Sequence, residues 1–149
     1  MIKTYSLKSD GNKNISNNFK VSEFACKDGS DKILIDLELV DKLQQLREYL
    51  KKPIIITSGY RTSSYNKDCG GANNSYHLKG QAVDIFAKNI NPRIIALWAE
   101  FNGLGGVGLY INRSQEFVHI DTRDNKYRWI NNKGTQTAVN NLFDKVVKL

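Results

Sequence analysis

The sequence is poor in the residues that cross-link or bridge small proteins. Among its 149 residues are two cysteines, two prolines and two histidines. Two thiols, Cys26 and Cys69, exclude both a disulfide-rich scaffold and a zinc module held by four thiolates. The sequence leaves a Cys26–Cys69 bridge open, and we interpret Cys69 as a buried or loop thiol rather than a metal ligand.

Long apolar runs are also absent. The first 18 residues are polar, rich in Lys, Ser and Asn, and lack the apolar stretch of a signal peptide or membrane span. We therefore expect a chain made in the cytoplasm without an export signal. Its length fits one domain that is large enough to bury a core.

Positive charge is abundant but scattered. The chain has 22 Lys and Arg against 15 Asp and Glu, which gives a formal net charge of +7. Such an excess attracts polyanions, whether nucleic acid, an anionic lipid surface or a wall polymer. No run of five basic residues marks a nucleic-acid patch, so we expect no nucleic-acid partner.

The apolar pattern predicts mixed helix and strand. Asp36 is a plausible N-cap, and a three-and-four spacing of apolar residues predicts a helix to about Lys51, which Pro53 stops. Residues 54–57 and 81–87 are predicted strands, and residues 62–76 a long irregular loop. Asn91 and Pro92 begin a predicted helix that ends at Gly103.

The rest of the chain predicts an antiparallel hairpin and a terminal helix. Strands are expected at 107–111 and 117–122, joined by the polar turn 112–115. Apolar residues at Val139, Leu142, Phe143 and Val146 predict a C-terminal helix that packs on the core. The fold class is therefore α+β, a single domain with a central, mainly antiparallel sheet flanked by helices.

Both histidines lie in short segments that are typical of metal sites. Asp84 follows His77 by seven residues, with Gly80 between them, and His119 lies in the predicted hairpin. Each residue alone also has an ordinary interpretation, as a loop histidine, a capping carboxylate and a strand histidine. Together, two imidazoles and one carboxylate leave a fourth tetrahedral position for water, as a catalytic zinc requires. This combination favours a zinc hydrolase with its metal on one sheet face.

The sequence resembles a known family over about residues 19–129. The matching motifs are Ser58-Gly59-Tyr60-Arg61, Asn66, Gly70-Gly71-Ala72, Ser75-x-His77-x-x-Gly80-x-Ala82-x-Asp84, Gly106-x-Gly108-x-Tyr110 and Phe117-Val118-His119-Ile120-Asp121. They are similar to the zinc D-alanyl-D-alanine carboxypeptidase family, which includes peptidoglycan endopeptidases of phage endolysins. The resemblance divides the chain into a polar segment 1–18, a zinc peptidase domain 19–130 and a C-terminal helix in 131–149.

The resemblance implies a role for each matching residue. His77, Asp84 and His119 would bind one Zn²⁺ per chain. Arg61 would stabilise the oxyanion or hold the substrate peptide, a task that suits a permanently charged fork of donors. Ser75 would bind substrate. Glu116, three residues before His119, occupies the family position of the general base.

The base assignment has a rival in Asp121. Residues three apart in a regular strand face opposite sides, so Glu116 can reach the metal of His119 only from a turn or a bulge. Asp121 shares a face with His119 and is a candidate either for the base or for a carboxylate that orients a ligand imidazole. Arg61 also has a structural alternative, a pair with Asp68 or Asp84.

Two functions remain in competition. The first is a zinc peptidase that cleaves stem peptides of bacterial peptidoglycan, as a carboxypeptidase or an endolysin-like endopeptidase, acting at the cell wall as a monomer of phage or prophage origin. The second is a binding module that keeps the zinc without the catalysis and recognises wall or protein partners. From ordinary imidazole values, zinc affinity is expected to fall below about pH 6.

Overall fold

The computed structural model describes residues 1–147 and confirms the α+β class. A sheet of six strands has the order β3-β4-β6-β5-β7-β8, and a separate pair is formed by β1 and β2. The strands are β1 (Ile2–Ser6), β2 (Lys32–Asp36), β3 (Ile55–Ser58), β4 (Ala82–Phe86), β5 (Gly106–Ile111), β6 (Phe117–Asp121), β7 (Tyr127–Asn132) and β8 (Thr135–Val139). Every neighbouring pair is antiparallel except β5 with β7, so the sheet is mainly antiparallel as expected.

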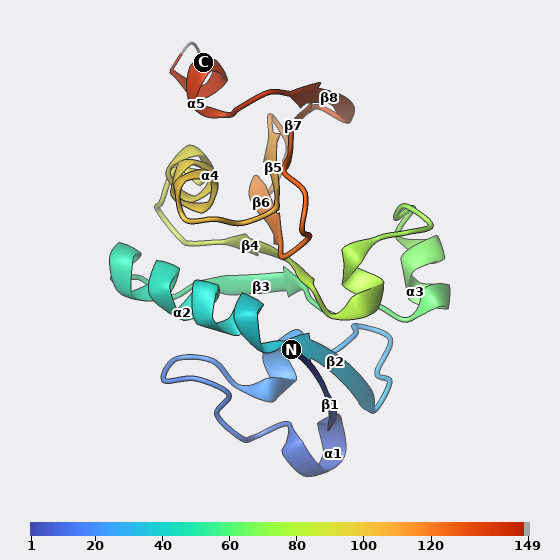
Figure 1. Ribbon diagram of the computed structural model, residues 1–149. Helices are drawn as coiled ribbons and strands as arrows, with labels where there is room; N and C mark the ends of the chain where they lie inside the picture. Colours follow the sequence, from blue (N-terminus) through green and yellow to red (C-terminus); the bar gives the residue numbers. More distant parts are fainter. Residues whose placement is uncertain (148–149) are drawn as a thin grey trace.

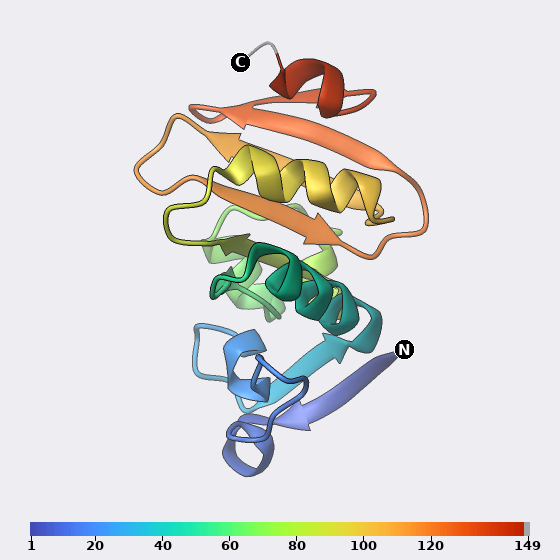
Figure 2. The ribbon, with the colours of Figure 1, turned by 90° about the vertical axis from the view of Figure 1, so that its left-hand side faces the viewer.

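The helices divide between the two faces of the large sheet. The long helices α2 (Leu37–Leu50) and α4 (Pro92–Phe101) lie in front of the sheet in Figure 2 and cover one face. The short helix α3 (Ser63–Asp68) lies on the opposite side in Figure 1, and the 3-10 helix η2 (Tyr76–Lys79) packs against β4. One sheet face is therefore buried under long helices, while the other carries only short elements.

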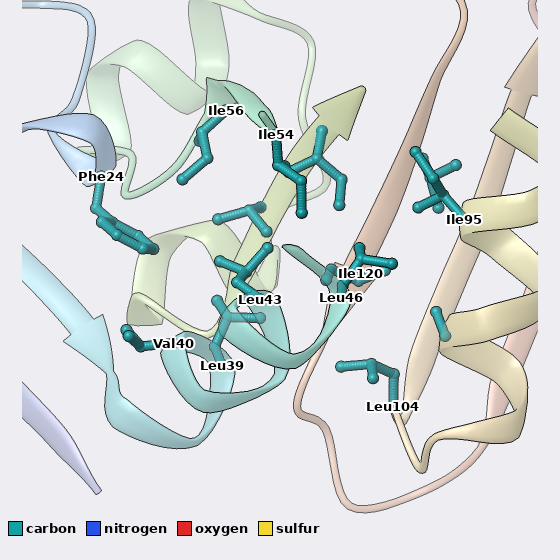
Figure 3. Packing of buried hydrophobic residues seen from close by; sticks show 14 of the residues in the cluster. Phe24, Leu39, Val40, Leu43, Leu46, Ile54, Ile56, Ile95, Leu104 and Ile120 are labelled. Atoms are coloured by element: carbon teal, nitrogen blue, oxygen red, sulfur yellow. The ribbon is translucent and has the colours of Figure 1, made fainter. Parts of the chain in front are cut away.

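Helix α2 forms where its apolar spacing predicts it. The Asp36 carboxylate accepts a hydrogen bond from the Glu38 N–H and caps the first turn. Leu39, Val40, Leu43 and Leu46 are buried on one side of the helix. Figure 3 shows them packed with residues of neighbouring elements, which include Phe24, Ile54, Ile56, Ile95, Leu104 and Ile120. This packing provides the rigid layer behind the large sheet.

Two predicted segments differ from the structure, and a third contains elements for which the sequence gave no prediction. The expected loop 62–76 contains α3, because the Thr62 hydroxyl accepts from the Tyr65 N–H and caps a helix there. The polar segment 1–18 contains β1 and the short helix α1 (Leu7–Asp10), since β1 pairs with β2. The C-terminal helix is only α5 (Phe143–Val146), while Val139 lies in β8. Lys148 and Leu149, at the end of that predicted helix, lie outside the described residues.

The remaining predictions from the apolar pattern agree with the structure. Strands β5 and β6 pair antiparallel across the turn 112–115, so the predicted hairpin is confirmed.

Both thiols are free, Cys26 buried and Cys69 exposed, which rules out the bridge left open by the sequence. Within residues 1–147, the longest apolar helices are too short to traverse a lipid bilayer.

Candidate metal centre

Strand register places two of the candidate ligands side by side. One cross-strand row runs through all six strands of the large sheet, because residues in register lie directly opposite one another. Its members are Ser58, Asp84, His119, Gly108, Trp129 and Ala138. Asp84 and His119 are thus neighbours on the face that the long helices leave free, although 35 residues separate them in the sequence.

The third candidate, His77, reaches the row from η2. The Ser75 hydroxyl accepts from the His77 N–H and caps this short helix, and Gly80 ends it with a φ of +71°. A side chain at Gly80 would also collide with the backbone of Leu34, so glycine is required there twice. The Arg61 N–H donates to the His77 carbonyl at 3.0 Å, which ties the helix to the end of β3.

The three side chains converge on one point. One ligating atom from each of His77, Asp84 and His119 lies within 4.8 Å of the others. The Asp84 Oδ1 atom lies 3.3 Å from His77 Nε2 and 3.0 Å from His119 Nδ1. A tetrahedral metal with bonds of 2.0–2.2 Å spaces its ligands about 3.3–3.6 Å apart, close to these values. All three residues are buried.

The outward-facing atoms of the three residues are also held. His77 Nδ1 lies 2.8 Å from the Gly59 carbonyl, and His119 Nε2 lies 2.8 Å from Asp121 Oδ2. An acceptor on the outer nitrogen fixes the tautomer and turns the lone pair of the inner nitrogen towards the cluster, which is the usual support of a metal-binding histidine. The donor set therefore fits a zinc ion.

Asp121 is a deeply buried carboxylate behind His119. The Arg123 guanidinium donates to it through Nε at 2.8 Å and Nη2 at 2.6 Å. A side chain at Gly106, its partner in register on β5, would collide with the Asp121 carboxylate. Gly108 in the same way leaves room for the Trp129 indole, whose ring centroid lies 5.0 Å from that of His119. The two glycines thus let large side chains support the ligand face.

The electrostatics of the cluster separate the two histidines. Burial lowers the pKa of His77, and the nearby Asp84 offsets this only in part. Burial also lowers the pKa of His119, but hydrogen bonds to Asp121 and Asp84 outweigh it and raise this pKa to about 9. The pKa of Asp84 and that of Asp121 are held well below their usual range, because interactions with the histidines, and with Arg123 for Asp121, outweigh burial.

Arg61 and Ser75 lie beside the cluster. Arg61 Nη2 donates to Asp84 Oδ2 at 3.1 Å, Nε to Ser58 Oγ and Nη1 to Asn66 Oδ1. The pair with Asp84 is one of the two structural alternatives that the sequence left open. A guanidinium has five N–H donors, so two remain for a ligand in the cleft that Arg61 lines.

Glu116 is the one candidate that the structure does not bring to the cluster. It lies in the turn before β6, and its Oε1 accepts from the Asn112 N–H at 3.0 Å. It lines a different cavity, together with Lys88, Ile90 and Arg113. The turn position that the sequence required is therefore present, but the carboxylate closes the hairpin instead of facing the metal site.

The cleft at the cluster has a volume of about 560 Å³. Several of its residues have no role in the sequence interpretation: Tyr76, Tyr110, Arg123, Tyr127, Trp129 and Gln136. The Trp129 Nε1–H donates to the Tyr110 hydroxyl at 3.1 Å. Asp121 and Arg123 are two residues apart in the sequence, and this spacing was the available signal for their ion pair. The pair could be recognised only once the neighbouring strands were in place.

Comparison with known proteins gives a family and two sets of relatives. A family model described as Peptidase M15 matches residues 17–121. The peptidoglycan L,D-endopeptidase MepK of Escherichia coli K12 is 40% identical over 95 residues, which cover 59% of this chain and 51% of that protein. A probable peptidoglycan L,D-endopeptidase MepK of Haemophilus influenzae is 36% identical over 74 residues, 46% of this chain and 39% of that protein. The chain spans about half the length or less of the curated relatives it matches.

Proposed function

Because the chain belongs to the Peptidase M15 family, as its motifs indicated, we propose that it is a zinc-dependent peptidase that cleaves stem peptides of bacterial peptidoglycan. The observation that carries the proposal is the convergence of three ligating atoms whose outer partners fix both histidine tautomers. The names of the relatives favour an endopeptidase that cuts between an L and a D centre over a D-alanyl-D-alanine carboxypeptidase.

In this proposal His77 Nε2, Asp84 Oδ1 and His119 Nδ1 hold one zinc ion. When bound there, zinc polarises the scissile carbonyl and lowers the pKa of a water molecule to near 7. Arg61 holds the second oxygen of Asp84 and offers its two remaining N–H groups to the peptide carbonyl. Ser75, which lines the same cleft, contacts the peptide backbone beside His77.

Asp121 acts through His119 in this account. Its carboxylate bonds the nitrogen opposite the one that faces the metal, so the imidazole ring separates it from the reacting atoms. Asp121 is therefore a positioning residue rather than the general base. Its charge keeps the Nε2–H tautomer and the orientation of the ring.

The two carboxylates considered for the role of general base, Glu116 and Asp121, lead to opposite predictions. Glu116→Gln should keep zinc and reduce turnover less than about tenfold, because Glu116 bonds the Asn112 N–H outside the cleft. Asp121→Asn should lower zinc affinity about 10–100-fold. Zinc competition with a chelating dye and initial rates at saturating zinc measure both effects. A dead Glu116→Gln variant with full zinc would restore Glu116 as the base and require the turn to move.

Zinc affinity should begin to fall at a higher pH than the ordinary pKa of a free imidazole suggests. The raised pKa of His119 means that its Nδ1 carries a proton up to about pH 9 before a metal binds, while the lowered pKa of His77 keeps that ring neutral. Each zinc ion must displace one proton, so affinity should fall about tenfold per pH unit on acidification from about pH 8.5 to 6.5. Competition titrations across this range measure the slope.

The same shift predicts how the metal-free protein responds to pH. Because the pKa of His119 is raised above the ordinary imidazole value of 6.5, its contribution to stability is present below that value and is lost as pH rises through about 9. Zinc should remove this dependence. A zinc affinity that does not change between about pH 8.5 and about pH 6.5 would contradict the proposed ligand role of His119.

The proposed bond is tested by digestion of purified peptidoglycan. Mass spectrometry of the released fragments identifies the new amino and carboxyl termini. We expect new termini within the stem peptides or their cross-links, and none after zinc is stripped with a chelator. Binding to intact sacculi without any new terminus would instead support the zinc-stabilised binding module.

A further inference from the structure

Arg123 is a charged residue of the cleft that the proposed chemistry uses only in part. It follows β6 and lines the same cleft as the metal cluster. Its Nε and Nη2 atoms form a side-on fork with the Asp121 carboxylate. The Arg123 side chain is 16% exposed to solvent, whereas the Asp121 side chain beneath it is fully buried. One edge of the guanidinium is thus fixed by the protein, and the group stays accessible.

Aromatic rings fix the plane of the same guanidinium. Its central carbon lies 4.4 Å from the ring centroid of Tyr76, 5.3 Å from that of Tyr127 and 5.7 Å from that of Trp129. Contacts of this kind stabilise the cation. Together with the Asp121 pair they hold the group rigid, so little side-chain entropy would be lost if it bound a ligand.

The second edge of the guanidinium has no partner among residues 1–147. Nη1 forms no hydrogen bond there, and Nη2 uses one of its two N–H groups on Asp121. The spare N–H groups form a second fork that points away from Asp121, and this fork matches the two oxygens of a carboxylate.

The charge of the cleft also favours an anion. Arg61 and Arg123 balance Asp84 and Asp121 in two ion pairs, so a divalent cation on the cluster leaves the cleft net positive. Within residues 1–147, no other carboxylate belongs to the cleft-lining residues, since Glu116 lines a separate cavity. An acidic group on the peptide therefore meets attraction without local repulsion.

We propose that Arg123 is a carboxylate subsite, which selects peptides that carry a free carboxylate close to the scissile bond. This inference rests on the proposed peptidase function and adds its substrate preference. Asp121 and the His119 ring separate the guanidinium from the metal position. The recognised carboxylate therefore belongs to a neighbouring residue of the peptide, not to the residue whose carbonyl is cleaved.

The test compares pairs of synthetic stem peptides. The two peptides of a pair differ at one acidic residue, which carries a free carboxylate in one peptide and a carboxamide in the other, and each acidic residue is amidated in turn. Wild type should cleave one of the carboxylate forms about 10–100-fold more efficiently, the effect of one hydrogen bond to a charged group. Arg123→Gln should bring the ratio of kcat/KM values for that pair close to one, and Arg123→Lys should retain part of the preference. Lys79→Gln is the control, an exposed basic residue beside Tyr76 that does not line the cleft.

Each outcome decides between the claims. Because Arg123 also holds Asp121, zinc content is measured for every variant. The ratio of kcat/KM values for the two peptides is then measured at full zinc occupancy. Under that condition the loss of a structural contact lowers both rates alike and leaves the ratio unchanged. Equal cleavage of every pair by wild type, or an unchanged ratio in Arg123→Gln, overturns the subsite and leaves the peptidase standing. Cleavage of neither form overturns the peptidase and the subsite together. If Arg123→Gln does not fold, an unchanged ratio in Arg123→Lys overturns the subsite.

Discussion

His77→Ala should leave a chain that holds no zinc after dialysis and loses peptidase activity by about 10³-fold or more. His77 supplies one of three ligating atoms, and its ring is held in place by the Gly59 carbonyl, so its removal leaves the cluster with two protein ligands. Zinc contributes several kcal/mol to such reactions, and each 1.4 kcal/mol is about tenfold in rate. Metal analysis of the dialysed protein and release of amino groups from peptidoglycan measure the two losses.

The matched control for this variant is Gln136→Ala. Gln136 lines the same cleft, but its side chain forms no hydrogen bond with another described residue. It should keep its zinc and most of its activity. Thermal unfolding verifies that His77→Ala is still folded, as expected because the apolar cluster under α2 and α4 does not include His77. One zinc per chain in a folded His77→Ala/His119→Ala double variant would refute the ligand assignment.

Arg61→Lys should reduce the catalytic constant about 10²-fold or more at saturating zinc. A lysine keeps the charge but loses the planar fork, and removal of one oxyanion donor typically has this effect. Zinc affinity should also fall, about 10–100-fold, because Arg61 holds the second oxygen of the ligand Asp84. The sequence left the partner of Arg61 open between Asp68 and Asp84, and the observed 3.1 Å pair with Asp84 is the basis for this second effect.

The two effects of Arg61→Lys are separated by measuring rates over a range of zinc concentrations. Arg113→Lys is the control, since Arg113 lies over the rings of Tyr110 and Phe117 but lines a different cavity. Normal turnover by Arg61→Lys at full zinc occupancy would mean that Arg61 serves Asp84 alone. A variant that fails to fold would assign Arg61 a structural role through Ser58 and Asn66.

Local patterns were sufficient for much of the fold. The helix α2, the helix α4 after Asn91 and the hairpin of β5 and β6 follow from apolar spacing and capping residues, which act over a few residues. The convergence of His77 and Asp84 was also predictable, because one short unit, η2 followed by β4, carries both. His119 joins them through strand pairing. The sequence linked it to the pair through the predicted hairpin and the ligand chemistry of two imidazoles and one carboxylate, and the family motifs added to that link.

Long-range pairing accounts for what the sequence could not give. Strand β7 pairs parallel with β5, and β8 is added at the edge, although helical spacing was the stronger local signal near Val139. The position of Glu116 depends on the shape of the turn 112–115, which closes on the Asn112 N–H. Arg123 gained a role only when Tyr76 and Tyr127, far apart in the sequence, were seen to lie beside it.

The most direct test is a zinc titration of the stripped wild-type protein with peptidoglycan as substrate. Zinc is removed with a chelator and returned in measured steps, while released amino groups are counted. Activity should be absent without metal, rise in proportion to added zinc and reach its plateau at one ion per chain. Activity that survives complete removal of zinc, or a folded protein with one bound zinc that releases no amino group, would contradict the proposed zinc peptidase.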